Sequence, residues 1–169
     1  MTNEQKLNEE LAYALSKKAH HGQKYGGHDY FKRHVLGVAD NFSPKCEATN
    51  QENYNCIKCG IELERNYSNP RCASYDHEAY IVALLHDVVE DSHVTDSVIF
   101  NLFGHKISHA VELLTRETKT HYDLYIEALT HYPLARKVKI ADLEFHLSQP
   151  VKKNQAKYEK ALAYLKAVK

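Results

Sequence analysis

Residues 83–92 read ALLHDVVEDS, and this stretch sets ionisable side chains inside an apolar run that extends from residue 81 to residue 89. Such a run is typical of a helix that is buried on nearly all sides. Unpaired carboxylates in an apolar interior cost several kcal/mol each, so something must neutralise them. The four ionisable residues are His86, Asp87, Glu90 and Asp91.

The apolar run predicts one central helix from about Asp76 to Asp91. Residues four apart lie on the same side of a helix, so His86 pairs with Glu90 and Asp87 pairs with Asp91 on one broad stripe. A divalent cation neutralises carboxylates directly and would account for their burial. The stretch therefore favours a metal site.

Two protein ligands rarely hold such an ion, so further ligands are expected from other helices. His34 and Asp142 are the best candidates, because each is polar where a core face is expected. A site of two histidines and two aspartates suits manganese, iron, magnesium or zinc. The alternative is structural: a lone histidine in an apolar helix is usually a hydrogen-bonded core residue, and carboxylates at a helix end are usually solvated.

Helical periodicity continues through most of the chain, and strand signals are scarce, so the sequence predicts an all-α fold with a single domain over residues 1–169. An apolar stripe at Leu7, Leu11 and Leu15 predicts the first helix over Asn3–Ala19. The other helices are expected at residues 34–41, at 95–103 with Gly104 ending the helix, at 106–114, at 121–132, across 134–147, and at 152–167.

Charge and composition limit the classes of partner. The 22 lysines and arginines balance the 22 aspartates and glutamates, which argues against nucleic acid. The N-terminal residues lack the apolar core of a signal peptide, and no stretch reaches the length of a membrane span. We therefore expect a cytoplasmic protein without a membrane partner. Twelve histidines are compatible with metal binding or proton transfer.

Residues 43–74 break the helical pattern, because they contain few apolar residues, two prolines and every cysteine of the chain. We interpret them as an insertion between two helices. A structural zinc site is favoured by the single CxxC and the polar surroundings, with two disulfides or free thiols as alternatives. A lid, a dimer contact and a recognition element all remain open as its role. The candidate zinc ligands are Cys46, Cys56, Cys59 and Cys72.

The ordered motifs AHHGQKY, ALLHDVVEDSHVT, LFGHKISHAVELLTR and LARKVKIADL, with His34 between the first two, resemble the HD-domain phosphohydrolases. Within them, the motifs are most similar to the branch that hydrolyses the alarmone (p)ppGpp. The resemblance covers almost the whole chain apart from the cysteine segment. It implies that Glu90 and Asp91 form the catalytic pair. It also implies a metal, usually manganese in this branch, bound by His34, His86, Asp87 and Asp142.

Substrate recognition is expected around this centre. Donors and stacking faces are available at Lys24, Arg116, Tyr122, Tyr125, Lys137 and Lys139, although solvated lysines and core tyrosines are the plain alternative. The sequence departs from the family at Tyr25, where the family usually has arginine, and at Val35, where it has proline. It departs again at His146, where asparagine is common. The arginine and asparagine positions belong to the nucleotide side of the pocket.

The resemblance implies a metal-dependent hydrolase of a nucleotide phosphate or pyrophosphate, most similar to a guanosine-3′,5′-bis(diphosphate) 3′-pyrophosphohydrolase. The nearest alternatives on the same scaffold are a nucleotide monophosphatase and a cyclic-nucleotide phosphodiesterase. A different class is a non-catalytic nucleotide sensor whose cysteine segment binds a partner. The pair Glu90 and Asp91 argues against a sensor, because pure binding does not need residues that activate water.

Replacing all four cysteines with serine should remove zinc and leave a second, exchangeable metal in place. The measurement is metal analysis of protein purified without chelator. Loss of both metals in the variant would show that the two ligand sets have been divided wrongly.

Overall fold

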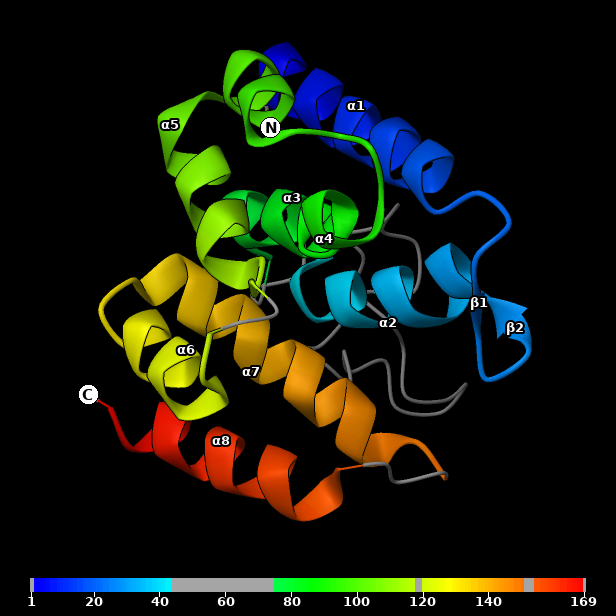
Figure 1. Ribbon diagram of the computed structural model, residues 1–169. Helices are drawn as coiled ribbons and strands as arrows, with labels where there is room; N and C mark the ends of the chain where they lie inside the picture. The colour runs from blue at the N-terminus through cyan, green and yellow to red at the C-terminus, as the bar shows by residue number, and fades with distance from the viewer. Residues whose placement is uncertain (1, 44–74, 118–119, 151–153, 169) are drawn as a thin grey trace, which may run out of the picture.

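Helix α3 (His77–Leu85) lies at the centre of the molecule (Figure 1). In the computed structural model, which describes residues 2–43, 75–117, 120–150 and 154–168, it packs on four α-helices and on two shorter helical turns. All residues of α3 from Ile81 to Leu85 are buried, as the apolar run predicted. The four contacting helices are α1 (Asn3–Ala19), α2 (Leu36–Ala39), α5 (Asp96–Leu114) and α7 (Pro133–Ser148).

The remaining helices confirm the all-α prediction. Helix α8 (Gln155–Ala167) packs along α7 and contacts α6 (Tyr122–Leu129), as Figure 1 shows. Among the described residues, the only strands are the two-residue β1 (Lys24–Tyr25) and β2 (His28–Asp29), which pair antiparallel. No helix within the described ranges is both long enough and apolar enough to cross a membrane.

The helix ends that the sequence predicted agree with the structure in part. Gly104 has φ of 77°, which interrupts α5 where the sequence predicted a helix end. Helix α8 begins at Gln155, and Lys152, where the sequence predicted its start, lies outside the described residues. Helix α1 has the bounds that its apolar stripe predicted.

The prediction of one unbroken central helix is wrong. Helix α3 stops at Leu85, and a single further turn, α4 (Val88–Asp91), follows it. The His86 Nδ1–H donates to Ala83 O at 2.8 Å, the carbonyl that an uninterrupted helix would offer to the amide of Asp87. Asp87 has φ of −106° and ψ of 0°, a sparsely populated conformation. His86 and Asp87 therefore lie in a turn.

His34 belongs to an unusual helical segment. A π-helical turn, η1 (Phe31–Val35), leads directly into α2 and then into the 3₁₀ turn η2 (Asp40–Phe42). The helix thus begins three residues earlier than predicted. Three apolar residues of this segment are buried, namely Val35, Val38 and Ala39. Single π-helical turns are frequent at functional sites.

The predicted insertion begins and ends at one place in the fold. The backbone amide of Asp76 bonds to Phe42 O at 3.5 Å, so the chain leaves η2 and returns to α3 at adjacent points. The four cysteines lie outside the described residues, and both the zinc site and the domain boundary stay predictions.

Gly37 is expected to be essential for the packing of α2 on α7. A Cβ atom at this position would lie 2.3 Å from Cε2 of Phe145 on α7. We expect Gly37→Ala to lower the free energy of unfolding by about 1–3 kcal/mol, because the Phe145 ring must move. Urea denaturation measures the change. In a Phe145→Leu background the same substitution should cost clearly less, and an equal cost in both backgrounds would contradict this explanation.

Candidate active site

Three buried side chains from separate elements meet beside the broken end of α3. His34 comes from η1, His86 from the turn after α3, and Asp142 from α7. They are 1%, 2% and 3% exposed, and one candidate ligand atom from each lies within 4.8 Å of the others. This group can hold a metal ion.

Asp87 reaches the same place. Its Oδ2 lies 3.1 Å from His34 Nε2 and 3.0 Å from His86 Nε2. The structure therefore brings together all four residues that the sequence predicted as ligands. The turn that interrupts the helix allows the adjacent His86 and Asp87 to point to one centre.

The donor atoms fit a divalent cation. Because His86 Nδ1 carries the proton donated to Ala83 O, its Nε2 in the neutral ring presents a lone pair to His34 Nε2, 3.2 Å away. Within the described part of the chain, imidazole nitrogens lie near the buried Asp142 Oδ1, but none is placed to donate a hydrogen bond to it. Two imidazole nitrogens and carboxylate oxygens suit Mn²⁺, Fe²⁺ or Zn²⁺.

The electrostatics of the site demand positive charge. Burial alone would lower the pKa of His86, but the nearby carboxylates of Asp87 and Asp142 raise this pKa to about 9. Burial lowers the pKa of His34. A proton on His86 or a divalent cation at the centre would balance the carboxylates.

Asp142 is also held from its other side. Lys139 Nζ lies 2.8 Å from Asp142 Oδ2, and His146 Nε2 lies 3.2 Å from Oδ1. Burial opposes ionisation of Asp142, but Lys139 and the surrounding imidazoles hold its pKa well below the usual value. Lys139 was predicted as a substrate donor, and the structure places its ammonium against this carboxylate and 5.5 Å from the Tyr125 ring centroid.

Glu90 and Asp91 lie on α4, one turn beyond Asp87. Burial raises the pKa of both carboxyls, and the negative charge of Asp87 raises it further. Glu90 Oε2 accepts a hydrogen bond from the Arg116 backbone amide at 3.1 Å. This contact orients the Glu90 side chain.

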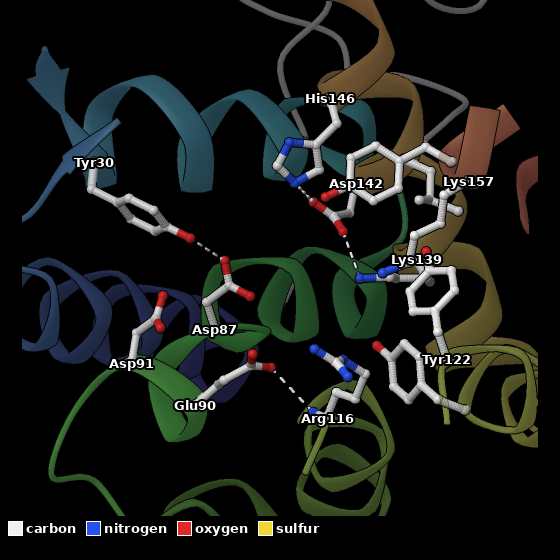
Figure 2. Close-up of a pocket in the computed structure, with 13 residues that line it drawn as sticks. Tyr30, Asp87, Glu90, Asp91, Arg116, Tyr122, Lys139, Asp142, His146 and Lys157 are labelled. Atoms are coloured by element: carbon white, nitrogen blue, oxygen red, sulfur yellow. Dashed lines mark hydrogen bonds and ion pairs between the residues drawn. The ribbon is translucent and has the colours of Figure 1, made fainter. Parts of the chain in front are cut away.

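Acidic and cationic side chains lie on opposite walls of one cavity of about 220 Å³. Figure 2 shows Asp87, Glu90 and Asp91 on one side and cationic side chains on the other. Lys157 Nζ lies 3.7 Å from the ring centroid of Tyr122, whose buried hydroxyl has no hydrogen-bond partner among the described residues. An anionic substrate fits between these walls. The cations are Arg116, Lys139 and Lys157.

The two main departures from the family pattern contact each other. Tyr25 OH and His146 Nδ1 are 2.9 Å apart, and the Tyr25 ring stacks on His34 with centroids 5.2 Å apart. A second cavity of about 530 Å³ includes Lys24 and Tyr25 in its lining, and it shares His146 and Tyr158 with the first cavity.

The lining of the two cavities differs from the predicted set of substrate residues. Lys137 lines neither of these cavities and instead pairs with Asp76 at 2.6 Å. Sequence reasoning missed Tyr30, Lys157 and Tyr158, which all line the first cavity. The polar first half of the last helix was a signal for Lys157, but solvated lysines give the same pattern.

The comparisons with known proteins bear on the fold. No family model matches the sequence, and no curated protein matches it either. A solved structure, described as a metazoan ortholog of SpoT that hydrolyzes ppGpp and plays a role in starvation responses, matches with a TM-score of 0.61 at 20% identity. The match covers 95% of this chain and 83% of that one. The two proteins share a fold. This likeness agrees with the all-α fold that the sequence predicted.

Mn²⁺ should stabilise the protein, because a cation that binds only the folded state adds about 2.7 kcal/mol at one hundred times its Kd. Asp142→Asn should lose this gain, since it removes a buried ligand charge. Urea denaturation with and without Mn²⁺ measures the difference. Asp123→Asn, which alters an exposed carboxylate on α6, is the matched control and should keep the full gain. An undiminished gain in Asp142→Asn would place the ion elsewhere.

Proposed function

We propose that the protein is a metal-dependent phosphohydrolase that acts on a nucleotide phosphate or pyrophosphate. One observation carries the proposal: a buried set of metal-ligating side chains opens onto a cavity with carboxylates on one wall and cations on the other. Pure binding of an anion has no use for Glu90 and Asp91, whose negative charge would oppose it. Hydrolysis does need such groups, because a base must take a proton from water.

The residues have separate roles in the proposed reaction. His34, His86, Asp87 and Asp142 would hold the ion, for which manganese is our first choice. When bound there, a divalent cation supplies a Lewis acid that polarises a phosphoryl oxygen and acidifies water.

Glu90 and Asp91 would orient the attacking water and accept its proton. Burial raises the pKa of both carboxyls, which makes them stronger bases than carboxylates in water. The water oxygen bonds to phosphorus, the ester bond breaks, and the leaving oxygen receives the proton that the carboxylate took from water. Arg116 and Lys157 face the developing negative charge from the other wall.

Guanosine-3′,5′-bis(diphosphate) is the favoured substrate, with cleavage releasing pyrophosphate from the ribose 3′ oxygen. The solved structure with the same fold is described as a protein that hydrolyzes ppGpp, and this supports the choice. A cavity of about 220 Å³ is small for a whole nucleotide, since ligand pockets typically measure about 300–1,000 Å³. The adjoining cavity, with Lys24, Tyr25 and His146, would then take the remainder.

A nucleotide monophosphatase or cyclic-nucleotide phosphodiesterase is the second candidate. The Tyr25–His146 contact favours it, because these residues replace the arginine and asparagine that the resemblance assigns to the nucleotide side. The predicted substrate residues do not discriminate between the two candidates, since Tyr122, Tyr125 and Lys139 line the first cavity and Lys24 lines the second. The zinc proposed for the four cysteines is a separate proposal, because these residues lie outside the described ranges.

A Mn²⁺-supplemented panel of ppGpp, pppGpp, ordinary nucleotides and cyclic nucleotides tests the proposal. We expect ppGpp turnover, and Glu90→Gln should reduce kcat about 10²–10⁴-fold because a general base is lost. Metal content should stay unchanged in this variant.

Glu112→Gln, which alters an exposed glutamate on α5, is the matched control and should retain full activity. Turnover of another substrate class would select the second candidate. No turnover of any member would favour a nucleotide sensor, and turnover that survives Asp87→Ala would contradict the proposed site.

A further inference from the structure

The hydroxyl of Tyr30 donates a hydrogen bond to Asp87 Oδ2 at 2.6 Å (Figure 2). The accepting oxygen is the one that lies 3.1 Å from His34 Nε2 and 3.0 Å from His86 Nε2. Among the four candidate ligands, Asp87 has the most exposed side chain, at 20%. Its carboxylate is therefore the ligand with most freedom to turn toward solvent.

We propose that Tyr30 is a positioning residue that fixes the Asp87 carboxylate against the two histidines and so pre-forms the metal site. The inference rests on the proposed metal centre and assigns a role to a residue outside the ligand set. Ligating carboxylates commonly depend on such hydrogen bonds for their orientation.

Packing holds the Tyr30 ring in place. The ring centroid of Tyr30 lies 5.0 Å from that of His20, 5.1 Å from that of His34 and 6.1 Å from that of Tyr25. Tyr30 immediately precedes the π-helical turn η1, which contains His34. The ligand and the residue that orients a second ligand thus belong to one local segment, so their relative position is set by a few backbone dihedrals.

The same stretch of chain also holds α4. The buried His20 bonds through Nδ1 to Gln23 Oε1 at 2.8 Å, and Gln23 Nε2 donates to Asp91 O at 2.7 Å. Tyr30 thus acts on the Asp87 side chain while Gln23 holds the backbone at the other end of α4. Hydrogen bonds from Tyr30 and Gln23 therefore hold both ends of the segment from Asp87 to Asp91.

Tyr30 can serve only as a donor here. An ionised carboxylate only accepts hydrogen bonds, so the Tyr30 hydroxyl is the donor in this contact. It can hold an anionic ligand in one orientation before the ion arrives.

Tyr30→Phe removes the hydroxyl and retains the ring. We expect the Kd for Mn²⁺, measured by calorimetric titration of metal-free protein, to rise about 10–100-fold. At saturating Mn²⁺, kcat should change less than about threefold, because the ion itself then holds Asp87. Tyr132→Phe is the matched control: it removes a hydroxyl that bonds to Lys106 O at 3.2 Å and lines neither site cavity. Its Mn²⁺ affinity should equal that of the wild type.

A double-mutant cycle with Asp87→Asn tests whether Tyr30 affects Mn²⁺ binding through the Asp87 carboxylate. Tyr30→Phe should weaken Mn²⁺ binding much less in the Asp87→Asn background, since the bond it removes acts through that carboxylate. Equal weakening in both backgrounds would overturn the inference, as would unchanged affinity with a loss of kcat, which would mean that Tyr30 touches substrate. Failure of the wild type to bind Mn²⁺ would instead overturn the proposed function and this role together.

Discussion

Negative charge at the centre of the bundle is the constraint on which the rest of the structure depends. Asp87 and Asp142 share a pocket with two buried imidazoles, and this group persists only if positive charge balances the carboxylates. Lys139 supplies part of that charge from one side. The remaining imbalance, expressed in the raised pKa of His86, is what a divalent cation would relieve.

The helices around α3 position the side chains of this centre. The apolar run of α3 provides a rigid core, and its interruption after Leu85 turns two consecutive side chains toward one point. The π-helical turn and α7 bring one further candidate ligand each from distant parts of the sequence. The carboxylates of α4 and the cations of other elements line the same cavity, and this arrangement supports the proposed hydrolysis of an anionic ester (Figure 2).

The sequence predicted the all-α fold from its helical periodicity. It predicted the grouping of the four candidate ligands because ionisable side chains in apolar stretches need an opposite charge when they are buried. It did not predict the break at His86. The break involves a hydrogen bond from the His86 side chain to the Ala83 carbonyl, and such a bond does not change the hydrophobic periodicity. Tyr30 was missed because a tyrosine before a buried helix resembles any core aromatic residue. Tyr25 and His146 were each recognised as departures, but their mutual contact, across 121 residues, required the fold.

Anomalous diffraction at the manganese absorption edge, from crystals grown with Mn²⁺, tests the central claim most directly. We predict one strong peak between His34, His86, Asp87 and Asp142, with nitrogen and oxygen atoms of all four as ligands. No peak at this position in Mn²⁺-saturated crystals, or a peak coordinated only by residues elsewhere, would contradict the account.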